Sequence, residues 1–166
     1  MTPIRTRLRG ARKALVALHI IASVGLLGAT SSSLLLALSA AVSDDAQLAH
    51  SAYRMMSTQS LVFGIPLSFL SLGTGVALGA ATKWGVTRYR WTTAKLVLLV
   101  LVIFNGALGI GPTTEARLNG DGSEWALVGI VGASVFMLAT SVVLSVYKPG
   151  GRRRGLALGR RARAVA

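Results

Sequence analysis

Four polar side chains lie in or beside the apolar stretches of this 166-residue chain: His19, Gln59, Lys95 and Asn105. A neutral imidazole is a common ligand of metals and of haem iron, and a lysine ammonium can hold an anionic group. At about 1.5 Å per helical residue, His19 lies about 7 Å, and Lys95 about 3–5 Å, inside the ends of their stretches. The pair at nearly one depth is the predicted cofactor-binding site.

Each of these two residues also has a structural interpretation. A histidine inside a helix bundle can be a neutral group that is hydrogen-bonded to a neighbouring helix, and a lysine near a helix end can extend its ammonium to the membrane interface. If Lys95 and His19 share a pocket, the ammonium disfavours a second positive charge and keeps the imidazole neutral, as an axial ligand must be. Whether they share one depends on helix packing, and the sequence leaves both interpretations open.

The sequence argues against several other kinds of site. The second histidine, His50, falls about 36 Å from His19 if the first apolar stretch is one helix, so a single haem or metal ion cannot bind both. The chain has no cysteine, which excludes disulfides, thiolate metal sites and covalent c-type haem. No carboxylate lies inside an apolar stretch. We therefore predict no catalytic residue and no metal site, and we expect a protein that is not an enzyme.

Four long apolar stretches must position these residues. The chain is 52% hydrophobic and 14% charged, with a mean hydropathy of +0.61. Each stretch is long enough for a helix that crosses a hydrocarbon core about 30 Å thick, and a bilayer requires backbone groups to be paired internally. The sequence predicts an all-α bundle of four transmembrane helices over residues 14–147, with spans at about 14–42, 56–82, 92–112 and 124–147.

The basic residues predict the orientation of this bundle. All 18 except Arg54 and Arg117 fall on one side of an alternating topology, and all five acids fall on the other. The positive-inside rule then places both termini in the cytoplasm and the connections 43–55 and 113–123 outside. Topology thus accounts for the net charge of +13 without a nucleic-acid partner. We expect the basic segments, 1–13 and a disordered tail at 148–166, to meet anionic headgroups of a bacterial plasma membrane.

The first span also needs to be compared with a signal peptide. A basic segment precedes it, and small residues at 38–41 resemble a cleavage site. The apolar stretch is, however, far longer than the roughly 7–15 residues of a signal peptide. We expect the first span to remain uncleaved.

Two faces of the predicted helices carry small or polar residues. On the first span His19, Ser23, Thr30 and Ser33 share an arc, which predicts that they face the bundle interior. Small side chains form a similar stripe on the second span and predict close helix packing, with the second span at the centre of the bundle. Pro66 is expected to kink that span. The members of the stripe are Ser57, Ser60, Gly64, Ser68, Ser71, Gly75 and Gly79.

Two short patterns resemble a known superfamily. ALHII at 17–21 opens the first span, and WTTAKL at 91–96 opens the third. Both are similar to four-helix bacterial proteins of the copper-resistance-D-like superfamily, including uncharacterised predicted membrane proteins and the haem-binding protoporphyrinogen oxidase. In the oxidase a first-helix histidine is thought to bind haem and a Trp-x-x-x-Lys opens the third helix, so the resemblance implies haem b binding by His19 and Lys95.

The chain also departs from the oxidase. Val16 stands where the oxidase has a lysine, small residues and serines replace its Tyr-Leu-Pro-Arg segment, and its third-helix histidine has no counterpart. These differences argue against the oxidase reaction. The leading hypothesis is a non-enzymatic membrane protein without a cofactor, acting through helix packing with itself, as a homo-oligomer, or with a membrane partner. The alternatives are a haem- or metal-binding redox protein that uses His19, and a small-solute permease.

Overall fold

The computed structural model describes residues 3–81 and 90–147, and the side chains of 10–80 and 90–147. The predicted disordered tail at 148–166 and most of the connection between the second and third spans lie outside the described residues. The described part contains helices and no strand. In chain order its elements are α1 (Pro3–Ala41), α2 (Ala46–Gln59), the π-helical turn η1 (Ser60–Gly64), α3 (Ile65–Ala81), α4 (Arg90–Asn105), the π-helical turn η2 (Gly106–Ile110), α5 (Gly111–Leu118) and α6 (Glu124–Tyr147).

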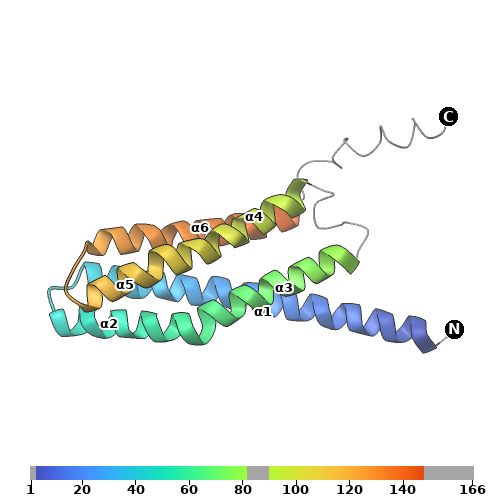
Figure 1. Ribbon diagram of the computed structural model, residues 1–166, viewed down its shortest axis with the longest axis horizontal. Helices are drawn as coiled ribbons and strands as arrows, with labels where there is room; N and C mark the ends of the chain where they lie inside the picture. The colour runs from blue at the N-terminus through green and yellow to red at the C-terminus, as the bar shows by residue number, and fades with distance from the viewer. Residues whose placement is uncertain (1–2, 82–89, 148–166) are drawn as a thin grey trace.

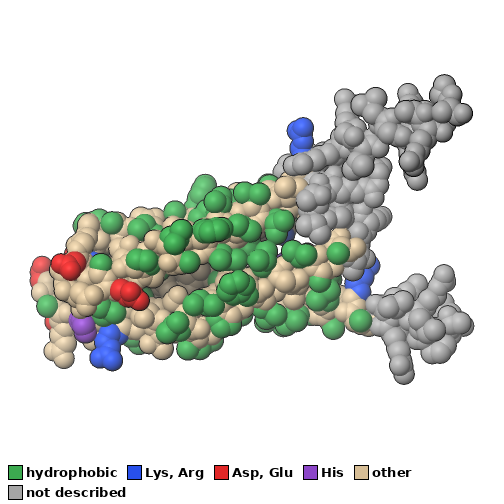
Figure 2. All heavy atoms as spheres, in the orientation of Figure 1, with side chains coloured by type: hydrophobic (Ala, Val, Ile, Leu, Met, Phe, Trp, Pro, Cys, Tyr) green, Lys and Arg blue, Asp and Glu red, His purple; other side chains and the backbone are tan. Residues whose placement is uncertain are grey.

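These elements form four helices that are long and apolar enough to cross a membrane, which confirms the predicted all-α class with four spans. The first is α1, the second is the continuous rod α2–η1–α3, the third is α4–η2–α5, and the fourth is α6. Figure 1 shows the four rods side by side, with the start of α1 and the end of α6 at the same end of the bundle. In Figure 2 carboxylates gather at the opposite end, as the predicted orientation requires.

The second and third spans are longer than predicted. The second starts at Ala46 instead of about residue 56, and the third runs to Leu118 instead of about residue 112. The Asp45 side chain caps the second span by accepting hydrogen bonds from the N–H groups of Gln47 and Leu48, at 2.8 and 3.3 Å. Most polar residues of α2 are exposed, while Tyr53 and Met56 are buried. The predicted connections 43–55 and 113–123 are therefore mostly helical.

Both long spans contain a π-helical turn shortly before a proline. Proline has no N–H group, so it removes one backbone hydrogen bond from the preceding turn. In η1 the N–H of Ile65 donates to the carbonyl of Ser60, and Pro66 follows. In η2 the N–H of Gly111 donates to the carbonyl of Gly106, and Pro112 follows. The irregularity expected at Pro66 takes the form of a widened turn, and a second one occurs at Pro112.

Packing places no span at the centre of the bundle, so the prediction of a central second span was wrong. The first helix α1 packs against α2, α3 and α6, while α4 packs against α3 and α6. The small residues of the second span allow close packing, but α6 packs against α1 and α4 instead of against the second span. The members of the small-residue stripe are all buried or half-buried and face inward, as predicted, but many of them border open space.

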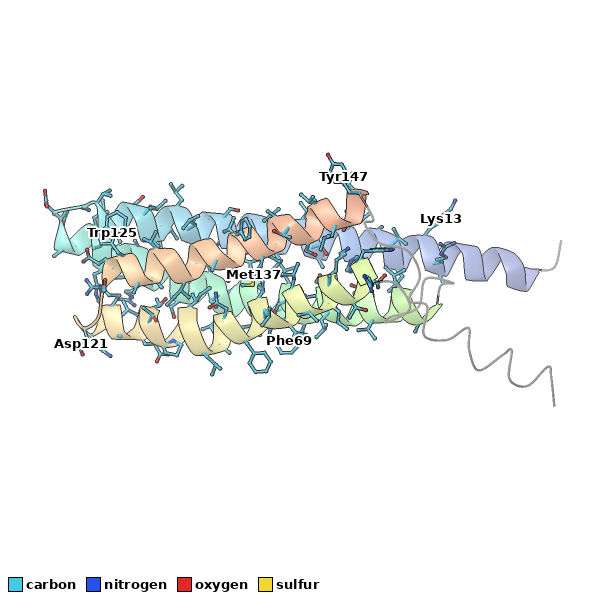
Figure 3. The ribbon with its side chains drawn as sticks, turned by 90° about the horizontal axis from the view of Figure 1, so that it is seen from above. Lys13, Phe69, Asp121, Trp125, Met137 and Tyr147 are labelled. Atoms are coloured by element: carbon cyan, nitrogen blue, oxygen red, sulfur yellow. The ribbon has the colours of Figure 1, made fainter. Side chains whose placement is uncertain are left out.

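The outer surface of the bundle is apolar along its length, as contact with lipid requires. Phe69 and Tyr147 point away from the neighbouring helices (Figure 3) and are 58% and 79% exposed. Inside, one apolar cluster joins α1, α2 and α6 near the acidic end; it contains Ala37, Ala40, Ala52, Tyr53, Met56, Leu127 and Val131. A second cluster, Leu26, Val102 and Leu138, crosses the middle of the bundle.

Candidate functional site

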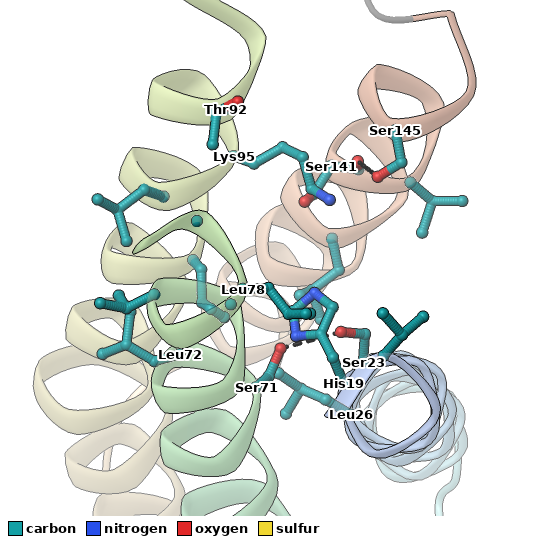
Figure 4. Close-up of a pocket in the computed structure, with 18 of the residues that line it drawn as sticks. His19, Ser23, Leu26, Ser71, Leu72, Leu78, Thr92, Lys95, Ser141 and Ser145 are labelled. Atoms are coloured by element: carbon teal, nitrogen blue, oxygen red, sulfur yellow. Dashed lines mark hydrogen bonds between the residues drawn. The ribbon is translucent and has the colours of Figure 1, made fainter. Parts of the chain in front are cut away.

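A cavity of about 330 Å³, the inner cavity, lies at the end of the bundle where the described chain begins and ends. Helices α1, α3, α4 and α6 form its walls, and both predicted cofactor-binding residues, His19 and Lys95, line it (Figure 4). The structure thus brings the two residues to one cavity, which the sequence left open. Their role in binding a cofactor stays a prediction.

Positive charge borders the inner cavity. Lys95 is half-buried near the start of α4, and its side chain extends toward Ser141 of α6, above the His19 ring in Figure 4. The exposed Arg12 of α1 also lines the cavity. Among the described residues that line it, none is an aspartate or glutamate. The remaining wall is mainly apolar, so the cavity suits a ligand that has an apolar body and an anionic group.

The hydrogen bonds of Thr74 indicate which nitrogen of His19 carries the proton. The Thr74 hydroxyl lies 2.6 Å from the Leu70 carbonyl oxygen, to which it donates, and 2.9 Å from Nδ1 of His19. A hydroxyl has only one proton to donate, so it accepts a hydrogen bond from an Nδ1–H group. The neutral ring then has an unprotonated Nε2. Metal-ligating histidines are usually held in this way, with the second nitrogen hydrogen-bonded to the protein.

Helix α3 is shaped to receive the imidazole. A Cβ atom added to Gly75 would lie 3.1 Å from Cε1 of His19, so any larger residue would push the ring. One turn after His19 on α1 and one turn before Gly75 on α3, the hydroxyls of Ser23 and Ser71 are 3.0 Å apart and form a second link between the two helices. Such interhelical hydrogen bonds are favourable inside a membrane, where few other partners exist. The ring is therefore held against α3 by Thr74 and Gly75, and the pair of serines links the two helices nearby.

The inner cavity includes an unpaired hydroxyl that sequence reasoning missed. Oγ1 of Thr92 is buried, lines the same cavity and has no hydrogen-bond partner among the described residues. A buried polar atom without a partner is uncommon in native structures and needs an explanation, such as a ligand or a water molecule. Thr74 was also missed, although it lies beside Gly75, and Gly75 was predicted only as a member of the small-residue stripe and not as a neighbour of His19.

The other two polar residues found in the sequence lie away from His19. Gln59 donates from Nε2 to the Ala29 carbonyl at 2.7 Å. Asn105 donates from Nδ2 to the Ile130 carbonyl and to the Ser134 hydroxyl, both at 2.8 Å. Gln59 therefore links the second span to the first, and Asn105 links the third to the fourth. His50 is exposed on α2 near the acidic end, and the described residues contain no group of three potential metal ligands.

A second cavity, the outer cavity, has a volume of about 420 Å³ and lies nearer the acidic end. The apolar cluster of Leu26, Val102 and Leu138 separates it from the inner cavity. Leu26 lines both cavities, while Leu138 lines the inner one and Val102 the outer one. The small-residue stripe borders both: its first four members line the outer cavity and its last three line the inner one. The small side chains of the stripe therefore leave room for the two cavities, in addition to allowing the helices to approach closely.

Four apolar rods, each long enough to cross a membrane, define a multi-pass integral membrane protein. Residues 13–109 match the model of the DUF2269 family of predicted integral membrane proteins, and the chain belongs to this family. The match covers His19, Thr74, Gly75 and Lys95, and it ends before α6. No curated protein and no solved structure matches the chain.

Proposed function

We propose that this protein binds haem b in the inner cavity, from the cytoplasmic side of a bacterial plasma membrane. The observation that carries the proposal is the distance of 2.9 Å between Nδ1 of His19 and a Thr74 hydroxyl that donates to Leu70, from which we infer that Nε2 keeps its lone pair. An imidazole in this form, beside a mainly apolar cavity, is suited to an axial position on iron. The membership in a copper-resistance-D-like superfamily that the ALHII and WTTAKL patterns imply is part of the same proposal.

The residues around the inner cavity fit the rest of such a ligand. Haem b has an apolar macrocycle and two carboxylates, so Lys95 and Arg12 would hold the carboxylates and the leucines of α1, α3 and α4 would contact the ring. The unpaired Thr92 hydroxyl offers one further polar contact. The volume of about 330 Å³ is at the lower end of the range for ligand pockets. Bound haem supplies one-electron redox chemistry, and the protein controls its environment.

Helix packing with a second copy or with a membrane partner remains a hypothesis for the same chain. The inward stripe serves contacts and cavities within the chain, so an interaction of this kind would have to use the apolar outer surface. That surface carries exposed side chains on every span, such as Ile21, Phe69, Leu108 and Phe136. No one face of it stands out as an interface, and the inner cavity therefore supports ligand binding better.

An absorption spectrum with a metal analysis tests the proposal. The protein is purified in a neutral detergent from cells supplied with haem, together with His19→Ala and His50→Ala. We expect a Soret band and stoichiometric iron in the wild-type protein and in His50→Ala, and neither in His19→Ala. A colourless, iron-free wild-type protein would contradict the proposal, as would a Soret band that survives in His19→Ala.

A further inference from the structure

The outer cavity is a second, partly open space that haem binding does not use. Both π-helical turns border it: Ser60, Leu61 and Gly64 from η1, and Gly106, Ala107 and Ile110 from η2. Irregular turns of this kind are rare and are often found at functional sites. Here they lie on two facing spans, and the glycine at each of them contributes no side chain to the space.

Three of the seven hydroxyl groups that line the outer cavity have already donated their protons. Thr30 donates to the Leu26 carbonyl at 2.8 Å, Ser68 to the Ile65 carbonyl at 2.8 Å, and Thr114 to the Ile110 carbonyl at 2.7 Å. Each hydroxyl has one proton and two lone pairs, so these three can offer only acceptor sites to a ligand. The Gln59 amide donates to Ala29 and keeps its carbonyl oxygen as a further acceptor.

The charge of the outer cavity also favours a ligand that donates hydrogen bonds, and in particular a cation. Glu115 is the single charged residue among the described residues that line it. The nearest basic residue along α5, Arg117, is held by Glu124 at 2.6 Å and does not line the cavity. An acceptor-rich wall with one carboxylate is complementary to a cation that carries several N–H donors.

The apolar part of the wall decides between a bare ion and an organic cation. Met56, Ile65, Val102, Ile103 and Ile110 line much of the cavity, and a bare metal ion would gain nothing from them. We infer that the outer cavity is a binding site for a small organic cation, a protonated primary amine with an apolar body. This site is separate from the haem site proposed above, because the cluster around Leu26 lies between them.

Calorimetric titration with three probes of one shape tests the inference. The protein in a neutral detergent is titrated with benzylammonium, with uncharged benzyl alcohol and with anionic benzoate. We expect benzylammonium to bind at least tenfold more tightly than benzyl alcohol, and benzoate to give no heat from the outer cavity. Equal affinities for benzylammonium and benzyl alcohol, or no binding of benzylammonium at millimolar concentration, would overturn the inference.

Two substitutions locate the binding site. Gly106 lines the outer cavity, and a Cβ added to it meets nothing within 4 Å, so Gly106→Leu fills the space without a backbone clash. Gly73 is equally open but exposed and lines neither cavity, so Gly73→Leu is the matched control. We expect Gly106→Leu to abolish benzylammonium binding and Gly73→Leu to preserve it. Unchanged binding in Gly106→Leu would place the amine elsewhere and overturn the inference.

Removal of the carboxylate charge gives a second readout that does not depend on a filled cavity. Glu115 is exposed, so Glu115→Gln should weaken benzylammonium binding by only about fivefold, without changing benzyl alcohol binding. An unchanged benzylammonium affinity would contradict the assignment of the cation to this cavity. The Soret band proposed for the inner cavity should be the same in Gly106→Leu and Glu115→Gln, so failure of either proposal can be recognised without the other.

Discussion

The inner and outer cavities lie one after the other in the same bundle and have opposite chemical character. Both are mainly apolar and both border the small-residue stripe of the second span. The inner one is lined by Lys95, Arg12 and His19, with no carboxylate among its described residues. The outer one is lined by Glu115 and by the hydroxyls of Thr30, Ser68 and Thr114, which can only accept from a ligand. The charge distribution from which the orientation in the membrane is predicted also gives the two cavities opposite charge.

The apolar cluster of Leu26, Val102 and Leu138 lies between the two cavities. All three side chains are at most 7% exposed, and they occupy the middle of the bundle between the two polar zones. A charged ligand in one cavity would have to cross this cluster to reach the other. The cavities are therefore expected to bind their ligands independently, and variants of one should leave the other unchanged.

Of the substitutions that test the difference between the two cavities, reversal of the charge at Lys95 should cause the largest change in haem affinity. In Lys95→Glu a carboxylate faces the anionic groups of the ligand, and like charges side by side cost several kcal/mol. We expect haem affinity to fall by about a hundredfold in a spectrophotometric titration. Lys13→Glu is the control, because Lys13 is exposed and does not line the inner cavity. Equal affinities in the two variants would mean that the charge of the inner cavity plays no part in binding.

Loss of the Thr74 hydroxyl should have a smaller effect at the same site. Thr74→Val keeps the shape of the side chain but removes the acceptor for Nδ1–H of His19. Hydrogen-bond partners of metal-binding histidines typically contribute about 10–100-fold to affinity, so we expect haem affinity to fall by about tenfold. Thr58→Val is the control, since Thr58 is exposed and donates to Arg54 within its own helix. Wild-type affinity in Thr74→Val would contradict the assigned role of Thr74.

Displacement of the His19 ring, without loss of a polar group, should reduce haem affinity by a still smaller factor. Gly75→Ala places a Cβ atom 3.1 Å from Cε1 of His19, so the ring must shift by a few tenths of an ångström. Sites of this kind depend on geometry held within about 0.5 Å. We expect a severalfold loss of haem affinity and a shifted Soret maximum. The exposed Gly73→Ala, made in open space on the same helix, should change neither, and a shift in both variants would remove His19 from the explanation.

The smallest effect is expected for Asn105, which stabilises the bundle between the third and fourth spans. Asn105→Ala removes two interhelical hydrogen bonds, each worth about 0.6 kcal/mol inside a membrane. We expect the free energy of unfolding, measured by detergent titration, to fall by about 1 kcal/mol, while haem affinity stays unchanged. Ser51→Ala, which removes an exposed bond within α2, should have no effect. A loss of haem affinity in Asn105→Ala would show that the two regions are coupled.

Sequence reasoning reached the four spans and the common end of the bundle at which His19 and Lys95 lie, because hydropathy and position along a helix determine both. It placed the start of the second span too late, because α2 is amphipathic and its capping residue, Asp45, appeared to belong to a loop. It also could not determine that α1 and α4 turn their polar residues toward one cavity. That outcome depends on helix rotation, which is set by packing among all four spans.

The outer cavity could not be predicted at all. Sequence shows serines and threonines on one face, but not that Thr30, Ser68 and Thr114 donate to carbonyls of their own helices. Nor does it show that the chain near Pro66 and Pro112 widens into π-helical turns. These features depend on the three-dimensional path of the backbone, and they determine what the cavity offers to a ligand.

The protonation of His19 is the central claim, and nitrogen NMR of histidine-labelled protein tests it most directly. The chain has two histidines, so His50→Ala leaves the His19 signals alone in the spectrum. For the ligand-free protein at neutral pH we predict a neutral ring with the proton on Nδ1 and an unprotonated Nε2. A proton on Nε2 of the neutral ring, or a doubly protonated ring, would contradict the proposal that His19 presents a free nitrogen to the inner cavity.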